Sequence, residues 1–327
     1  MAKARALDRR RKSVKNIRKI TRTMELIATA RFKKAMDRSV ASRDYTLRLA
    51  KILANIAAAT AGGAGAGSAL GFSHPLLEVR PTKRTAVLIL TGNRGLCGGY
   101  NSNVVRQAQA ILGQWRSEKV GLHTAVSGKR GISALKFRGV EIDERYLQFE
   151  DKPEFDQVAP IGRAYLEEYS AGRIDRLDVV YTRFDSIARQ ATVTEMLLPL
   201  KPPEAPSGAA SGAASGAASG AASGAASGAA REAAATGGLA SDDYDFYPSA
   251  QSILEEILPA SFMARLFKCF LDSAVSEQVA RMVAMKAASE NAGGLIKDLS
   301  RRYNRARQSQ ITGEIMEILG GVEALKK

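Results

Sequence analysis

The chain contains no proline and no glycine between Leu7 and Ala59. These two residues disfavour a helix interior most strongly, so their absence predicts one helix of roughly 75 Å over this stretch. A helix of that length is not stable alone and must pack against another element. Its apolar residues follow the 3-4 spacing of a coiled-coil seam, at Val14, Ile17, Thr21, Met24, Ala28, Ala35, Tyr45, Leu49, Ile52 and Ile56.

A second long helix is predicted at the other end of the chain, from Ser276 onward. Gly293 and Gly294 lie in its middle and weaken it by about 1 kcal/mol each relative to alanine. Two marginal helices at opposite termini predict an antiparallel coiled coil, with the middle of the chain inserted between them. Its apolar stripe comprises Val279, Met282, Val283, Leu295, Leu299, Tyr303, Ala306, Ile311, Ile315, Ile318 and Leu319.

The middle of the chain alternates strand-like and helix-like segments. Such alternation favours a largely parallel sheet in a layered α/β domain. The last two strands are joined by a short hairpin, which predicts an antiparallel edge. The expected strands are 85–90, 120–127, 177–184 and 191–198, and the expected helices are 103–116, 131–137 and 157–172.

Positive charge is concentrated in the first 51 residues, which carry 17 Lys and Arg and 4 Asp and Glu, a net charge of +13 out of +15 for the chain. A basic rod implies an acidic partner. Nucleic acid is one alternative, because such a helix can neutralise phosphates. Base-reading side chains are scarce, however, since residues 1–31 offer only Asn16 of that kind. Acidic protein loops fit at least as well.

Composition gives no indication of a cofactor or a metal. The two cysteines, Cys97 and Cys269, form no disulfide framework, and the two histidines, His74 and His123, restrict any metal site. The uncharged run 52–77 is long enough to cross a bilayer, but it consists largely of small residues. No membrane span is therefore expected.

The segment Thr91–Asn101 is a Gly-rich turn between a strand and a helix. Its glycine spacing does not match G-x-G-x-x-G, and no Lys-Ser/Thr pair follows. A structural turn is the better interpretation, with Cys97 as a packing residue. A nucleotide-dependent α/β enzyme remains the alternative that this turn suggests.

Between Ser207 and Ala230 the tetrapeptide Ser-Gly-Ala-Ala occurs six times. The repeat has no large apolar side chain to bury, and its glycines oppose helix formation. We expect a low-complexity insertion that carries no function.

Three segments together resemble the gamma subunit of the F-type (bacterial-type) ATP synthase. They are Ser13–Ala28, Arg94–Asn101 and Ser276–Ala288, the last followed by Ile311-Thr312 and Glu314-Ile315. They occur in the order that the family shows.

The resemblance implies a fold and a role. The fold is an antiparallel coiled coil of the terminal helices with an α/β domain beside its foot. The role is that of a non-catalytic shaft that couples rotation of the membrane c-ring to ATP synthesis or hydrolysis in the alpha and beta subunits. Implied partners are the alpha, beta and epsilon subunits and the c-ring, with no nucleic acid. The implied location is peripheral, at the cytoplasmic face of the bacterial inner membrane.

The resemblance also implies contact residues. On the shaft, Met24, Arg281, Gln308 and Thr312 match positions that meet the alpha and beta subunits, and the basic Arg9 and Arg10 join them. At the foot, Arg94, Asp245 and Tyr247 are the expected contacts with the c-ring or epsilon. Two residues depart from the family: Asn93 replaces an acidic residue, and Tyr247 stands where glutamate is frequent.

The expected organisation has six parts. These are a shaft helix at 1–59, a linker at 60–80, the α/β domain at 81–206, the insertion at 207–238, a foot segment at 239–261 and the second shaft helix at 262–327.

Overall fold

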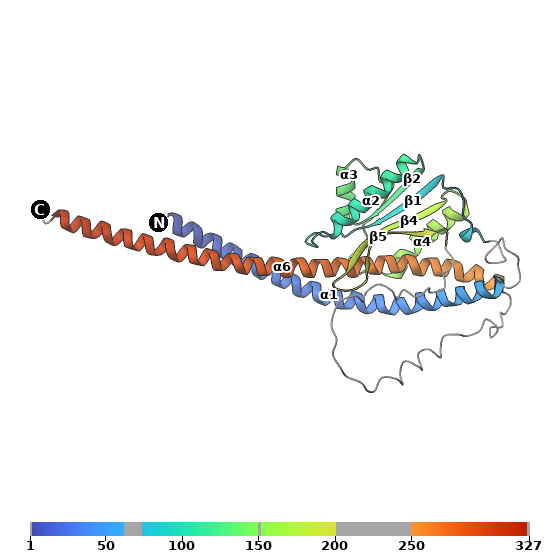
Figure 1. Cartoon of the computed structure of the whole chain (residues 1–327), viewed down its shortest axis with the longest axis horizontal. Coiled ribbons are helices and arrows are strands. Elements are labelled where there is room, and N and C mark those ends of the chain that lie inside the picture. The colour runs from blue at the N-terminus through green and yellow to red at the C-terminus, as the bar shows by residue number, and fades with distance from the viewer. Residues whose placement is uncertain (1, 62–73, 150–151, 201–249, 326–327) are drawn as a thin grey trace, which may run out of the picture.

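The computed structural model describes residues 2–61, 74–149, 152–200 and 250–325. Two long helices run side by side, and an α/β domain lies against one of them (Figure 1). The first helix, α1, spans Ala2–Ala61, and the second, α6, spans Ala250–Leu325. The chain's N- and C-termini lie at the same end of the pair (Figure 1), so the predicted antiparallel arrangement is confirmed.

The residues of α1 that face α6 recur every seven positions. A strict seven-residue repeat is the pattern of a left-handed coiled coil. Ile17, Tyr45 and Ile52, which the sequence placed in the seam, are exposed because they fall beside this stripe. The buried or half-buried positions of the repeat are Leu7, Val14, Thr21, Ala28, Ala35, Ser42 and Leu49.

Five strands form one sheet in the order β3-β2-β1-β4-β5. The first four are parallel, and β5 pairs antiparallel with β4, as predicted. The sequence did not reveal β3, because it is only three residues long and two of them are charged. The strands are β1 (Arg84–Leu90), β2 (Gly121–Ser127), β3 (Glu144–Tyr146), β4 (Arg176–Phe184) and β5 (Gln190–Leu198).

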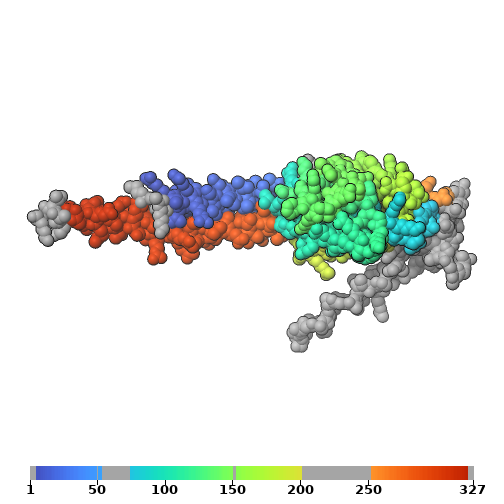
Figure 2. Space-filling view, turned by 90° about the horizontal axis from the view of Figure 1, so that it is seen from above, coloured from blue at the N-terminus to red at the C-terminus, as the bar shows by residue number. Residues whose placement is uncertain are grey.

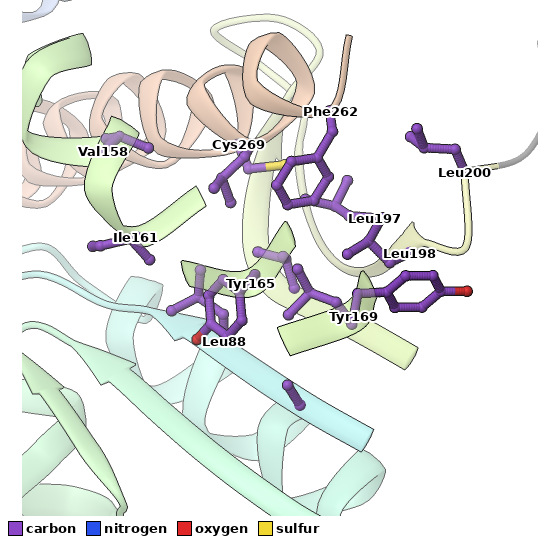
Figure 3. Packing of buried hydrophobic residues seen from close by; sticks show 14 of the residues in the cluster. Leu88, Val158, Ile161, Tyr165, Tyr169, Leu197, Leu198, Leu200, Phe262 and Cys269 are labelled. Atoms are coloured by element: carbon purple, nitrogen blue, oxygen red, sulfur yellow. The ribbon is translucent and has the colours of Figure 1, made fainter. Parts of the chain in front are cut away.

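Helices cover both faces of the sheet. On one face lie α2 (Tyr100–Ser117) and α3 (Lys129–Phe137), and on the other lie α4 (Phe155–Ser170) and α6 (Figure 1). A short 3-10 helix, η1, spans Pro75–Leu77. The larger core forms where α6 meets α4 and the sheet, and Figure 3 shows side chains from all three elements meeting there, among them Phe262, Tyr165 and Leu88.

The N-terminal part of α6 corrects the predicted foot segment. Residues 250–261 belong to α6, and Pro259 lies inside the helix without ending it. Leu254 and Leu258, which precede it, are buried in the larger core, and this packing offsets the loss of one backbone hydrogen bond. The insertion and residues 239–249 lie outside the described residues.

Candidate functional site: the shaft and its joint with the α/β domain

Beyond the α/β domain, α1 and α6 continue as a two-helix rod (Figures 1 and 2), which we call the shaft and define as residues 2–31 and 282–325. Ala28 is only 1% exposed, and such a small residue lets two helices approach closely. Nearer the N-terminus, the guanidinium of Arg11 lies 4.8 Å from the ring centre of Tyr303. The two helices therefore support each other along α1.

Among the described residues, nothing covers the end of α6. We call residues 308–325 the tip; Figure 1 shows α6 projecting past the start of α1 there. Gln308 and Thr312, two predicted contact residues, are exposed on the tip. A long apolar surface of this kind is typical of a region that another chain covers. Its large apolar side chains, 43–67% exposed, are Ile311, Ile315, Met316, Ile318, Leu319 and Val322.

A basic groove of about 910 Å³ lies between the two shaft helices. Arg22 pairs with Glu25 in the groove at 2.7 Å, and Met24, which is half-buried, lies between groove residues. Arg9 and Arg10 are exposed closer to the N-terminus. The groove's cations are Lys15, Arg18, Lys19, Arg22 and Lys286, and its second carboxylate is that of Glu290.

The Gly-rich turn after β1 joins the α/β domain to α6. A Cβ atom at Gly92 would lie 2.6 Å from Oε1 of Glu277, so any other residue would force the buried Glu277 carboxylate to move. Next to it, the hydroxyls of Tyr100 and Ser273 share a hydrogen bond of 2.6 Å. We call this contact between the turn and α6 the joint.

Arg281 takes part in the joint. Its guanidinium donates to Glu277 at 2.5 Å and to the carbonyl oxygen of Gly95 at 3.5 Å, and its side chain is 11% exposed. The family resemblance placed Arg281 on the surface that meets a partner, whereas in the structure its side chain bonds within the chain. Contact of Arg281 with another subunit stays a prediction.

The turn is tied to the start of α3, which lies beside it. The first three backbone N–H groups of α3 all donate to residues of the turn. The N–H of Lys129 donates to Oδ1 of Asn93, that of Arg130 to the carbonyl of Gly92, and that of Gly131 to Oγ1 of Thr91. These bonds give the turn a structural role, and the interpretation as a purely structural turn stays a prediction.

Asn93, where the family commonly has an acidic residue, uses both ends of its amide. Its oxygen accepts from the N–H of Lys129 at 2.9 Å, and its nitrogen donates to the carbonyl of Phe149 at 2.5 Å. A carboxylate could accept the first bond but could not donate the second. Asn93 thereby ties three segments of the domain together.

Cys97 is buried in the same turn, and this burial raises the pKa of its thiol. Its Sγ accepts a hydrogen bond from the amide of Asn101 at 3.1 Å. A buried thiol with a raised pKa is a poor nucleophile, in agreement with the predicted packing role.

A buried carboxylate lies where α1, α6 and the β4–β5 hairpin meet. Asp272 is 3% exposed, and burial raises the pKa of its carboxyl group to about 6. The hydroxyl of Ser39 on α1 donates to it at 3.3 Å. The charges of Lys268 and Arg183 favour the ionised form, and that of Glu195 opposes it.

The predicted foot residues do not form one described surface. Asp245 and Tyr247 lie outside the described residues. Arg94 is exposed beside Glu277 in a pocket of about 200 Å³ at the joint. Glu277 lies roughly 40 Å along α6 from its first residue, Ala250, at 1.5 Å per residue. The structure therefore separates Arg94 from the start of α6.

Sequence reasoning missed Asp272 and Glu277. Their neighbours in sequence include Lys268, Ser273, Ser276 and Gln278, so neither carboxylate interrupts an apolar pattern. Only their burial in the fold, at 3% and 9% exposed, indicates a specific polar contact for each.

Comparisons with known proteins agree with the resemblance seen in the sequence. The family described as ATP synthase matches residues 3–325. The chain is 53% identical to an ATP synthase gamma chain from Rhodopirellula baltica, with all of both chains covered. It is 34% identical to one from Dehalococcoides mccartyi strain BAV1, over 99% of this chain and all of that one.

Solved structures share the fold. The chain aligns with one in the Euglena gracilis mitochondrial ATP synthase, OSCP/F1/c-ring, with a TM-score of 0.61 at 18% identity, covering 99% of this chain and 95% of that one. A chain of the rotor from the same source gives a TM-score of 0.58 at 19% identity, covering 95% and 99%.

Proposed function

The chain belongs to the ATP synthase gamma chain family, and on that premise we propose that it is the central rotor shaft of an F-type ATP synthase. It is a non-catalytic subunit that couples rotation of the membrane c-ring to ATP synthesis or hydrolysis at sites formed by the alpha and beta subunits. The observation that carries this proposal is the shaft with its uncovered apolar tip.

The tip supports insertion into a surrounding head. The last turns of α6 present a contiguous series of large apolar side chains to solvent, which marks an interaction surface. An apolar tip in an apolar sleeve can turn without breaking directional bonds, because hydrophobic contacts have no preferred orientation. Gln308 and Thr312 add polar contacts to the alpha and beta subunits.

The basic groove supports a second zone of contact. Cations of both helices line it, and acidic loops of the head would be attracted to it. Met24, Arg9 and Arg10 belong to this zone. Because such contacts are exposed, each is weak enough to break as the shaft turns. The comparisons give no support to the nucleic-acid alternative.

The joint supports torque transmission. The hydrogen bonds of Tyr100 with Ser273 and of Arg281 with the carbonyl of Gly95 fix the α/β domain to α6. Ser39 on α1 contacts Asp272 on α6. A domain attached this way turns together with both helices. Its polar contacts are directional and largely shielded from water, so they resist rotation of one part against another.

The foot and the location follow from the same role. The c-ring and epsilon bind at the foot, and Asp245 and Tyr247 are contact candidates there. Arg94 keeps its proposed contact with the c-ring or epsilon, but at the joint and not at the start of α6. The subunit is peripheral at the cytoplasmic face of a bacterial inner membrane. None of the described helices has an apolar stretch that could cross a bilayer. The six-part organisation stands as proposed, except that α6 begins at Ala250.

Co-expression with the alpha and beta subunits tests the proposal. We expect a stoichiometric complex with ATPase activity that depends on this chain. A variant that ends at Arg307 lacks the tip, and we expect it to fold with no loss of helix beyond the deleted residues but to assemble poorly. Free chain alongside an active complex of alpha and beta alone would overturn the proposal.

A further inference from the structure

The face of the α/β domain that points away from α6 is strongly basic. It consists of α2 and α3, and Figure 2 looks onto it, with no part of the shaft lying across it. Between Tyr100 and Val140 the sequence has seven Lys and Arg and a single Glu. The exposed cations include Arg106, Lys119, Lys129, Arg130, Lys136 and Arg138.

These cations are not neutralised by the rest of the described chain. None of the six forms an ion pair with another described residue. Arg106 and Arg138 hydrogen-bond only to the neutral amides of Asn103 and Gln109. The second bond, at 2.6 Å, links the end of α3 to the middle of α2, so the face is one connected surface.

An exposed aromatic side chain lies among these cations. Phe137, the last residue of α3, is 93% exposed, more than any other large apolar side chain among the described residues. Lys136 and Arg138 flank it in sequence. An exposed aromatic ring ringed by charge is the arrangement of an interface anchor surrounded by a polar rim.

We propose that the α2–α3 face binds an acidic surface of another subunit of the assembled complex, with Phe137 entering an apolar depression of that subunit. The cations supply charge complementarity, which sets the orientation and the rate of docking. The inference rests on the proposed function, because it takes the partner from the same complex.

The direction of the face argues against a bilayer as the partner. The face looks sideways from the long axis of the shaft (Figure 1). The membrane ring of the proposed function lies across the end of that axis, at the foot. A membrane would therefore meet the foot and not the α2–α3 face. A protein beside the domain can reach it.

Site-directed crosslinking in the complete complex tests the proposal. Cys97 and Cys269 are both buried, so an introduced surface thiol is the reactive one. Ser133→Cys places a photoreactive maleimide on the exposed side of α3, and Phe137 stays in place. We expect a crosslink to one other subunit. The matched control is Ala164→Cys, which is exposed on α4 at the other sheet face.

Charge reversal then tests the chemistry. In the Ser133→Cys background, Lys129→Glu with Lys136→Glu should lower the crosslink yield about tenfold, because repulsion replaces attraction. Phe137→Ser should lower the yield as well. Arg163→Glu with Arg173→Glu changes the net charge equally on other surfaces and should leave the yield unchanged.

Three outcomes would overturn the inference. The first is that the Ser133→Cys variant gives no crosslink in a complex that assembles and hydrolyses ATP. The second is a crosslink yield that the charge reversal leaves unchanged. The third is protection of the introduced thiol by phosphatidylglycerol vesicles but not by assembly. Each leaves the shaft role intact, since assembly and activity are measured on the same sample.

Discussion

Two parts of α6 have the same helical backbone but opposite surroundings. The part at the joint, around Phe262 to Val279, is buried on several sides by the sheet, α4 and α1. The tip exposes its apolar side chains, and no described residue covers them. The chain thus buries the apolar side chains of the first part by itself, whereas those of the tip require a partner to cover them. Substitutions in the two parts should separate folding from assembly.

The largest effect on stability is expected from Phe262→Ala. Phe262 is fully buried in the larger core (Figure 3), and removing its ring should lower the free energy of unfolding by about 3–5 kcal/mol. Urea unfolding of the purified chain measures this. A loss below about 1 kcal/mol would mean that α6 is not held by this core.

Asp272→Asn should give a gain of up to about 3 kcal/mol near neutral pH. The pKa of Asp272 is about 6 in the fold against an ordinary 3.8, and each unit of pKa is worth about 1.4 kcal/mol. The folded state holds the proton more tightly. The stabilisation from protonation is therefore complete below 3.8 and is lost as the pH rises through about 6.

The measurement for Asp272 is the difference in unfolding free energy between Asp272→Asn and the parent chain as a function of pH. The difference should grow between about pH 4 and pH 6 and stay constant above about pH 7. Comparing the two chains removes the contribution of the other carboxyl groups. A flat difference would contradict the burial of this carboxylate.

Gly92→Ala should cost about 1–3 kcal/mol, because the new methyl group would overlap the carboxylate of Glu277. Gly95→Ala is the matched control in the same turn. There the nearest atom is the flexible end of Arg130, at 3.1 Å, so the cost should be smaller. Thermal unfolding distinguishes them, and equal losses would rule out a specific joint at Gly92.

Ile315→Ala should change the stability of the isolated chain by less than about 0.5 kcal/mol, since the side chain is half exposed on the tip. In the complex the same change should weaken assembly with the alpha and beta subunits, by about tenfold in dissociation constant. If Ile315→Ala lowered the stability of the isolated chain but left assembly unchanged, the contrast between the two parts of α6 would be wrong.

The sequence was enough to predict the large features. The two terminal helices and most of the sheet follow from proline and glycine placement and from apolar periodicity, and these signals depend on near neighbours in the chain. The exact seam did not follow, because Ile17 and Tyr45 look like seam residues until the strict seven-residue spacing of Thr21, Ala28 and Ala35 is known.

The site was less predictable. Gln308 and Thr312 are exposed on the tip as expected, but Arg281 is engaged at the joint, because Glu277 lies one helical turn away and Gly95 comes from a distant part of the chain. The contact with Gly95 is long-range and leaves no local pattern, whereas the Glu277–Arg281 pair has the i,i+4 spacing of a helical ion pair and is visible in the sequence. The preference for glycine at position 92 also depends on α6, because Glu277 of that helix lies against it. In the sequence, only its place in a Gly-rich turn indicated a close approach.

The thiol reactivity of Ile318→Cys tests the central claim most directly. Ile318 is 67% exposed, and both natural cysteines are buried, so a maleimide should label the new thiol rapidly in the isolated chain. In the complex with the alpha and beta subunits we expect labelling at least about tenfold slower, because the tip lies inside the head. Equal rates in the two samples would show that the tip stays in solvent, and the chain would then not be a shaft.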